Sequence, residues 1–135
     1  KKNKSFKIFV LIGDGECNEG SVWEASMSAS HYKLNNLTAI LDNNNLQQTG
    51  SNDDIMSTKD LASKWRSFNW DVQEINGHDI PEILAAFNHV SEKPKLILAK
   101  TIKGKGFSFS ENNNDWHHNI MTKKQYEEAI KELNE

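Results

Sequence analysis

A short apolar run that leads straight into a Gly-Asp-Gly turn most constrains what this chain can fold into. Residues 7–12 (KIFVLI) predict a β-strand, and residues 13–15 form the turn. A second apolar run, residues 38–41 (TAIL), ends in an Asp-Asn-Asn-Asn sequence, and a helical segment lies between the two runs. Strands joined by a helical crossover are parallel, and their carboxyl ends meet at one edge of the sheet. We therefore expect Asp14 to lie beside the asparagines at an edge where α/β sheets bind ligands.

The rest of the chain alternates between strand and helix. Further strands are expected at residues 70–75 and 95–100, and a long irregular loop at residues 101–121. The expected helices are residues 19–31, a helix from a Ser57–Asp60 capping box to about residue 68, a helix capped by Asp79, and a final helix that starts at a Thr122–Gln125 capping box. This alternation predicts an α/β fold in a single domain over residues 1–135, with a mainly parallel sheet and helices on both faces.

Composition excludes several classes of protein. The longest apolar run, residues 8–12, is too short for a transmembrane helix or a signal peptide. A formal net charge of −3 argues against charge-driven, nonspecific binding of nucleic acid. The single cysteine, Cys17, excludes an internal disulfide and is typical of a reducing cytoplasm. We interpret Cys17 as a small buried residue rather than a reactive thiol, because no histidine lies near it in sequence.

Two features predict that further protein covers this domain. The chain begins close to its first strand without a preceding helix, although a parallel sheet needs cover on both faces. We expect the missing cover to come from a partner or from upstream residues that this chain lacks. The helix at residues 19–31 carries small residues such as Ala25 and Ala29, which fit either close packing on the sheet or a subunit interface.

Oxygen donors at the two strand ends indicate a divalent cation. The Asp14 carboxylate and the Asn44 amide oxygen are hard ligands that suit Mg²⁺, and neighbouring strands are close enough for both to reach one ion. Glu16, Glu19 and Glu24 would repel a bare phosphate at the helix start, whereas an intervening cation removes that conflict. The dinucleotide fingerprint, the P-loop and the EF-hand loop all fail to match here. The alternative is that Asp14 only caps the helix and the asparagines only form a turn.

The long loop at residues 101–121 holds a second group of candidate ligands. It contains a Trp-His-His sequence at residues 116–118 and two lysines, Lys103 and Lys105. Loops of this length are usually functional or disordered. These side chains therefore either face solvent or fold over a bound ligand and contact its phosphate. We interpret His78, in a Gly-His-Asp sequence, as a turn residue.

These motifs together resemble one family closely. Residues 13–15 (GDG) followed by Asn44 match the diphosphate motif of thiamine-diphosphate enzymes, and the sequences EG-x-x-WEA and HYKL-x-NL between them match transketolase. GHD at 77–79, KTIKGKG at 100–106 and WHH at 116–118 extend the resemblance over nearly the whole chain. The chain is thus similar to the thiamine-diphosphate-binding domain of transketolase, above all to the N-terminal subunit of split bacterial transketolases, truncated at its N-terminus.

The resemblance implies a thiamine diphosphate site with a metal ion. Asp14 and Asn44 would bind Mg²⁺ through their side chains and Leu46 through its backbone carbonyl, with Ca²⁺ as a substitute ion. The amide of Gly15 would donate to the diphosphate. The cofactor contacts that the resemblance implies are Gly13, Asp14, Gly15, Glu16, Asn44 and His118.

The resemblance also implies two catalytic side chains. Glu19 matches a glutamate that joins the two cofactor sites of the family's dimer. His118 matches a histidine that contacts the diphosphate and the substrate. The family usually has glycine after this histidine, whereas Asn119 follows here, so His117 is the alternative.

The implied activity is transfer of a two-carbon ketol unit from a ketose phosphate to an aldose phosphate, as in the pentose phosphate pathway. The family's essential glutamate lies in a pyrimidine-binding subunit or domain that this chain lacks. The chain is therefore expected to be inactive alone and to work in the cytoplasm within a homo- or hetero-oligomer. One alternative is half of another thiamine-diphosphate enzyme, of the deoxyxylulose-phosphate synthase or 2-oxo acid dehydrogenase type. The other is a truncated remnant that only folds or oligomerises.

Overall fold

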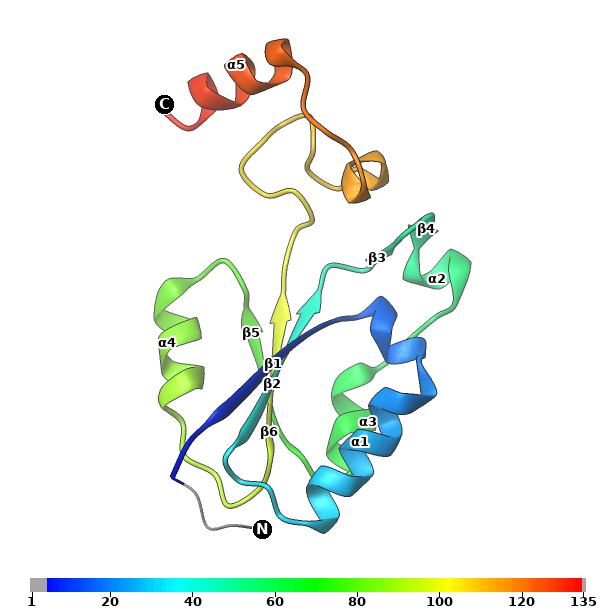
Figure 1. Ribbon diagram of the computed structural model, residues 1–135, viewed down its shortest axis with the longest axis vertical. Helices are drawn as coiled ribbons and strands as arrows, with labels where there is room; N and C mark the ends of the chain where they lie inside the picture. Colours follow the sequence, from blue (N-terminus) through cyan, green and yellow to red (C-terminus); the bar gives the residue numbers. More distant parts are fainter. Residues whose placement is uncertain (1–4, 135) are drawn as a thin grey trace.

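Four parallel strands form the central sheet of the structure, a computed structural model that describes residues 5–134 (Figure 1). The strands lie in the order β1–β2–β6–β5. Their bounds are β1 Ile8–Gly13, β2 Leu37–Asn43, β5 Asp71–Asn76 and β6 Lys95–Lys100. Every neighbouring pair in this sheet is parallel, which confirms the predicted α/β class.

The register of the sheet brings the ends of its strands together. Gly13 pairs with Asp42, Asp42 pairs with Ala99, and Ile75 of β5 also pairs with Ala99. The Gly-Asp-Gly turn, the asparagine run and the start of the long loop therefore leave the sheet at one edge, as the sequence predicts. This edge, where the four strands end, is called the carboxyl edge below.

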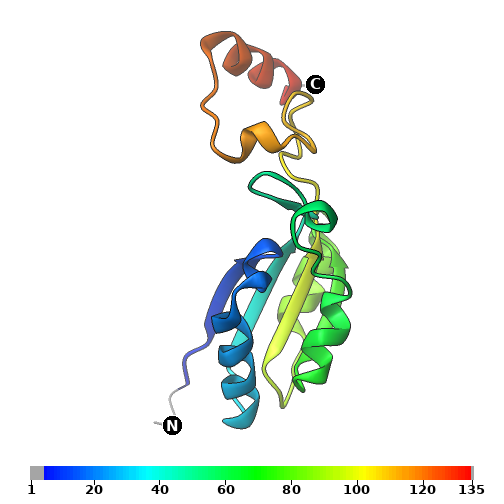
Figure 2. The ribbon, with the colours of Figure 1, turned by 90° about the vertical axis from the view of Figure 1, so that its right-hand side faces the viewer.

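Helices cover both faces of the sheet, as expected (Figures 1 and 2). Helices α1 (Gly20–His31) and α3 (Leu61–Ser67) lie on one face, and α4 (Ile80–Asn88) lies on the other. Ser26 and Ala29 of α1 are buried, so close packing explains these two small residues. Ala25 is exposed, and the subunit interface predicted for this helix stays a prediction.

Tryptophans form the core between the sheet and the helices α1 and α3. The rings of Trp65 and Trp70 are buried and meet edge to face, with centroids 4.7 Å apart. Trp23 packs on Trp65 with a centroid separation of 5.5 Å. Leu41 and Leu96, from the two central strands, are fully buried beneath them. Large aromatic rings bury much apolar area each, which lets a small sheet with short helices build a core.

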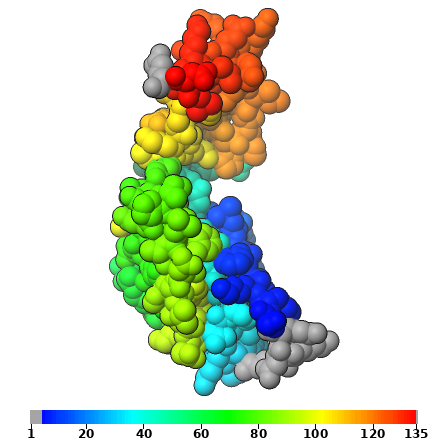
Figure 3. Space-filling model, turned by 90° about the vertical axis from the view of Figure 1, so that its left-hand side faces the viewer, coloured from blue at the N-terminus to red at the C-terminus, as the bar shows by residue number. Residues whose placement is uncertain are grey.

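Strand β1 does not have the buried environment that its apolar sequence predicts. It is an edge strand that pairs only with β2 in the described part of the chain, and the segment around it, in blue, lies open at the surface in Figure 3. Phe9 and Leu11 are 53 % and 70 % exposed. Phe87 of α4 reaches Phe9, with ring centroids 5.7 Å apart, but Leu11 is left open. An apolar run indicates that a strand prefers burial and says nothing of which neighbours cover it, so the cover expected from a partner or from upstream residues stays a prediction.

Two of the predicted helix starts are confirmed. Asp79 caps α4 by accepting a hydrogen bond from the N–H of Glu82 at 2.9 Å. Thr122 and Gln125 form the expected capping box of α5 (Lys123–Glu132). Both caps satisfy backbone amides that the helix itself leaves without partners.

The predicted capping box of Ser57 and Asp60 is wrong. Asp60 is itself the N-cap of α3 and accepts from the N–H of Ser63 at 2.9 Å. The hydroxyl of Ser57 instead donates to Asp53 at 2.5 Å. Asp and Ser are both strong N-cap residues, and the apolar face of the helix decides which of them lies at its first turn.

Several short elements lie at the carboxyl edge. They are the 3₁₀ helix η1 (Gly15–Asn18), the antiparallel pair β3 (Leu46–Gln47) and β4 (Gly50–Ser51), and the one-turn helix α2 (Asn52–Ile55). The polar segment at residues 47–57 therefore contains local structure of its own.

The segment after β6 lies beyond the carboxyl edge, where the space-filling view shows it as a separate mass at one end of the sheet (Figures 2 and 3). It is irregular apart from the 3₁₀ helix η2 (Asn114–His117) and α5. Phe109 stacks with Phe107 and contacts Trp116, with ring centroids 5.9 Å and 5.0 Å apart. The N–H of Ser108 donates to Glu132 of α5 at 2.8 Å. None of the helices within residues 5–134 combines the length and the apolar character needed to cross a membrane.

Replacing Leu96 by alanine is expected to destabilise the domain by about 2–5 kcal/mol, because it leaves a cavity in the middle of the core. The matched control is Leu133→Ala in α5, where the side chain is 62 % exposed and the expected loss is below about 1 kcal/mol. Urea unfolding of both variants measures the difference. Equal losses would contradict the placement of Leu96 in the core.

Candidate functional site

One buried carboxylate joins the ends of β1 and β2. The side chain of Asp14 is 1 % exposed. Its Oδ1 accepts from the N–H of Gly15 at 2.8 Å, and its Oδ2 accepts from the N–H of Asn45 at 2.6 Å. The N–H of Asp14 itself donates to the carbonyl of Asp42 at 3.0 Å. The structure thus brings Asp14 to the asparagine run, as the sequence predicts.

The electrostatics of this carboxylate suit a cation. Burial raises the pKa of Asp14 above its usual value, the charge of Asp42 raises it further, and hydrogen bonds led by that from Asn45 oppose this shift. Within residues 5–134, no lysine, arginine or histidine forms an ion pair with Asp14. Hydrogen bonds, a cationic side chain or a metal ion can each stabilise a buried carboxylate as an anion, and among the described residues Asp14 has only the hydrogen bonds.

A buried amide beside Asp14 also has spare hydrogen-bonding capacity. The side chain of Asn52 is 4 % exposed and faces the carboxylate closely enough to stabilise its charge. Among the residues that the structure describes, neither its nitrogen nor its oxygen has a partner at full hydrogen-bond geometry. The backbone N–H of Asn52 donates to the carbonyl of Asn45 at 2.9 Å, which places α2 against the same turn. Orphaned polar atoms in this position fit an additional polar ligand, such as a hydrated ion.

The other predicted metal ligands lie on the turn that contacts Asp14. The Asn44 side-chain oxygen accepts from the N–H of Leu46 at 3.0 Å, and Asn45 between them has a left-handed backbone with φ of 61°. No group of three or more His, Cys, Asp or Glu side chains in the described part of the chain could hold a metal ion. The candidate ligand set therefore consists of one carboxylate, one amide oxygen and one backbone carbonyl, a combination of hard oxygens that fits Mg²⁺ or Ca²⁺.

The glycines of the turn have amides that are engaged within the turn itself. The N–H of Gly13 donates to Oε2 of Glu16 at 2.6 Å, while that of Gly15 donates to Asp14. A Cβ atom at Gly15 would lie 3.2 Å from the side chain of Gln47, so this position is closely packed against β3. Glu19 precedes α1, is exposed and does not cap the helix with its side chain.

The histidines of the long loop form a second group of exposed side chains. His117 and His118 are both exposed, and their rings meet edge to face with centroids 4.5 Å apart. Lys103 Nζ lies 3.3 Å from Nδ1 of His117. Partial removal of water, together with the positive charges of Lys103 and His118, lowers the pKa of His117. No hydrogen bond within residues 5–134 links either histidine to the Asp14 turn.

Four hydrogen bonds at the carboxyl edge, two from Thr101 and two to Met56, have no signal in the sequence. The hydroxyl of Thr101 donates to the carboxylate of Asp42, and the N–H of Thr101 donates to the carbonyl of Asn43 at 3.2 Å. The carbonyl of Met56 accepts from both Asn18 and Gln47, at 3.2 Å and 3.1 Å. Most of these contacts join segments far apart in sequence, and none of them belongs to a motif from which it could have been predicted.

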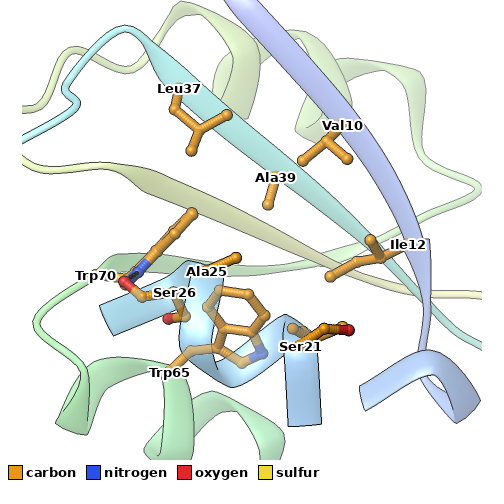
Figure 4. Close-up of a pocket in the computed structure, with 10 residues that line it drawn as sticks. Val10, Ile12, Ser21, Ala25, Ser26, Leu37, Ala39, Trp65 and Trp70 are labelled. Atoms are coloured by element: carbon orange, nitrogen blue, oxygen red, sulfur yellow. Dashed lines mark hydrogen bonds between the residues drawn. The ribbon is translucent and has the colours of Figure 1, made fainter. Parts of the chain in front are cut away.

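An apolar pocket of about 240 Å³ lies away from the Asp14 turn, between the sheet and the helices α1 and α3 (Figure 4). Val10, Ile12 and Ala39 line it from the strands, and Trp65 and Trp70 close it from below. None of its lining residues is charged, so it does not suit a diphosphate or a metal ion.

Comparison with known proteins assigns the chain to a protein family. Residues 2–134 match the family described as "Transketolase, thiamine diphosphate binding domain". The chain belongs to this family. It is 44 % identical over 133 residues to an apulose-4-phosphate transketolase subunit of Phocaeicola vulgatus, and 42 % identical over 129 residues to the 6-deoxy-6-sulfo-D-fructose transketolase subunit SqwG of a Clostridium species. These alignments cover 96 % and 93 % of this chain.

The fold of this transketolase-family chain also matches a solved transketolase. The crystal structure of the Campylobacter jejuni enzyme superposes with a TM-score of 0.91 over 96 % of the chain, at 31 % sequence identity. The chain covers 21 % of that enzyme and 47 % of each of the two bacterial relatives. It therefore spans about half the length of the curated relatives it matches.

The thiol of Cys17 is expected to be inert in this transketolase domain. Burial raises its pKa to about 11, which leaves only about 0.1 % thiolate at pH 8. Mass spectrometry of the Cys17 peptide after iodoacetamide treatment should show no modification of the folded protein and full modification in guanidinium. Rapid alkylation of the native protein would contradict the burial of Cys17.

Proposed function

We propose that this chain supplies the diphosphate- and metal-binding half of a transketolase active site. In this role it binds thiamine diphosphate and Mg²⁺ and works with a pyrimidine-binding subunit or domain. The assembled enzyme transfers a two-carbon ketol unit from a ketose phosphate to an aldose phosphate. The observation that carries the proposal is Asp14, which in a chain of this family is buried at the carboxyl edge, contacts the asparagine run and has no cationic side-chain partner within residues 5–134.

The residues at the carboxyl edge would hold the diphosphate end of the cofactor. The Asp14 carboxylate, the Asn44 amide oxygen and the Leu46 carbonyl would bind Mg²⁺, or Ca²⁺ in its place. The Gly15 N–H donates to Asp14 and is the amide that would bind a diphosphate oxygen of the cofactor. Thiamine diphosphate, when bound, supplies the carbanion chemistry of the reaction.

The long loop would contribute an imidazole to the diphosphate or to a substrate oxygen. His118 is the residue that the family pattern suggests, with His117 as the alternative. The contact of Lys103 with Nδ1 supports His117, because it orients that ring. The lowered pKa of His117 keeps its imidazole neutral near pH 7, so that it can donate one hydrogen bond without adding charge.

The chain would be inactive without its partner. The relative from Phocaeicola vulgatus is named as one subunit of a transketolase, and this chain likewise would need the pyrimidine-binding partner that carries the activating glutamate. Exposed Glu19 would join the two cofactor sites of the oligomer. The exposed apolar side chains of β1 support association with further protein. The single Cys17 is consistent with work in the cytoplasm.

A substrate panel tests the reaction with the natural protein and its partner. The two bacterial relatives are named for different sugars, apulose-4-phosphate and 6-deoxy-6-sulfo-D-fructose, so the panel includes both of these and the pentose phosphates. Ketol transfer from any of them supports the proposal. Turnover of pyruvate alone would favour the deoxyxylulose-phosphate synthase or 2-oxo acid dehydrogenase type. Absence of cofactor binding with the partner present would identify a remnant without enzymatic function.

Replacing Asn44 by alanine is expected to weaken Mg²⁺-dependent binding of thiamine diphosphate by roughly tenfold or more, because it removes one metal ligand. The matched control is Asn43→Ala in the same asparagine run, since Asn43 holds its neighbours at the edge through its backbone. Calorimetry with and without Mg²⁺ measures both. If the two variants bind alike, Asn44 is not a metal ligand.

A pair of variants distinguishes the two histidines. His117→Ala is expected to lower kcat/KM by about 10²-fold or more if this imidazole contacts the diphosphate or substrate, whereas His118→Ala should then stay within a few-fold of wild type. Steady-state assays of the reconstituted enzyme measure both. The opposite ranking would assign the role to His118, and two unaffected variants would exclude the loop from the active site.

A further inference from the structure

The turn between β5 and α4 is packed tightly against the base of the long loop. A Cβ atom added to Gly77 would lie only 2.5 Å from Cγ2 of Thr101 and 3.1 Å from the carbonyl oxygen of Lys100. The N–H of Gly77 donates to that same carbonyl at 2.8 Å. Only glycine permits this close approach, and the turn therefore packs directly against the end of β6.

The next residue in the turn makes a side-chain contact that its sequence does not suggest. Nε2 of His78 accepts a hydrogen bond from the backbone N–H of Ile102 at 2.8 Å. The backbone of His78 is itself fixed, because its N–H donates to the side-chain oxygen of Asn76 at 3.0 Å. A backbone amide can only donate, so this contact requires a neutral imidazole that carries its proton on Nδ1.

Ile102 is the last residue that the sheet region holds before the loop departs. Thr101, just before it, is bound to the side chain of Asp42 and the backbone of Asn43. Lys103, just after it, lies 3.3 Å from Nδ1 of His117. The direction in which the chain leaves Ile102 therefore sets the position of Lys103, which in turn contacts His117.

We propose that His78 is a positioning residue that anchors the loop at Ile102 and so places the loop's lysine and histidines over the carboxyl edge. This proposal rests on the proposed function, because the anchor matters only if the loop contacts the diphosphate or the substrate. A plain turn residue, as the sequence indicates, accounts for the backbone of His78 but not for its ring. Within residues 5–134, no hydrogen bond joins the His78 ring to the Asp14 turn or to the loop histidines, so His78 acts through the Ile102 amide.

Two substitutions of His78 test whether a hydrogen-bond acceptor at the position of Nε2 is what holds Ile102. In His78→Gln, the side-chain oxygen can reach the position of Nε2 and accept from Ile102. In His78→Asn, the side chain is one methylene shorter and its oxygen reaches only as far as Nδ1. Both variants are polar and both suit an exposed turn, so they provide a matched pair for the full-length protein with its partner.

The test uses two measurements on each protein. Site-resolved hydrogen exchange reports the Ile102 amide without cofactor, and calorimetry reports the dissociation constant of thiamine diphosphate in saturating Mg²⁺. His78→Asn is expected to speed exchange at Ile102 and to weaken cofactor binding, each by about 2- to 10-fold, as suits the loss of one exposed hydrogen bond. His78→Gln is expected to restore both values to near wild type.

Two results would overturn the anchor. One is wild-type exchange at Ile102 in His78→Asn, and the other is a glutamine variant that behaves like the asparagine variant. The exchange measurement does not need a bound cofactor, so it also separates this proposal from the proposed function. If wild-type protein binds no thiamine diphosphate, the proposed function fails, while the exchange comparison still decides whether His78 holds the loop.

Discussion

The buried carboxylate of Asp14 holds together the turns at the carboxyl edge of the sheet. It receives the N–H groups of Gly15 and Asn45 and so ties the turn after β1 to the turn after β2. Burial makes the charge on this group unfavourable, as its raised pKa indicates, and two amides offset that only in part. The buried amide of Asn52 faces this carboxylate and keeps hydrogen-bonding capacity to spare among the described residues. A buried carboxylate without a cationic side-chain partner among the described residues supports the metal site that we propose here.

A second set of contacts, which meets the first at Asp42, fixes the base of the long loop. Thr101 is bound to the end of β2, and Ile102 is bound to His78 in the turn before α4. The carboxyl edge therefore has two parts: a turn that offers oxygen ligands and a loop that offers imidazoles and lysine. The parallel register of the sheet brings both parts to the same edge, and the loop is directed by contacts at its base. This arrangement is consistent with half of an active site, in which other protein completes the contacts.

Much of the fold follows from patterns within short stretches of sequence. The strands, the crossover helix, the Asp79 cap and the Thr122–Gln125 box are local, and the structure has all of them. The approach of Asp14 to the asparagine run could also be predicted, because parallel strands end at one edge. The start of α3 could not, since Ser57 and Asp60 are both good caps and packing chose between them. The roles of Asn52 and His78 depend on partners 38 and 24 residues away, where no sequence pattern applies.

The sequence by itself determined the class of the fold, the place of Asp14 at a sheet edge and the family to which the chain belongs. These depend on periodicity, on glycine turns and on residue identity, which are properties of neighbouring residues. Only the tertiary structure decided that β1 is an exposed edge strand, that the turn amides are engaged with Asp14 and Glu16, and that the loop is held at Ile102. Burial and long-range hydrogen bonds depend on which segments meet in space, and that is settled by the packing of the whole chain.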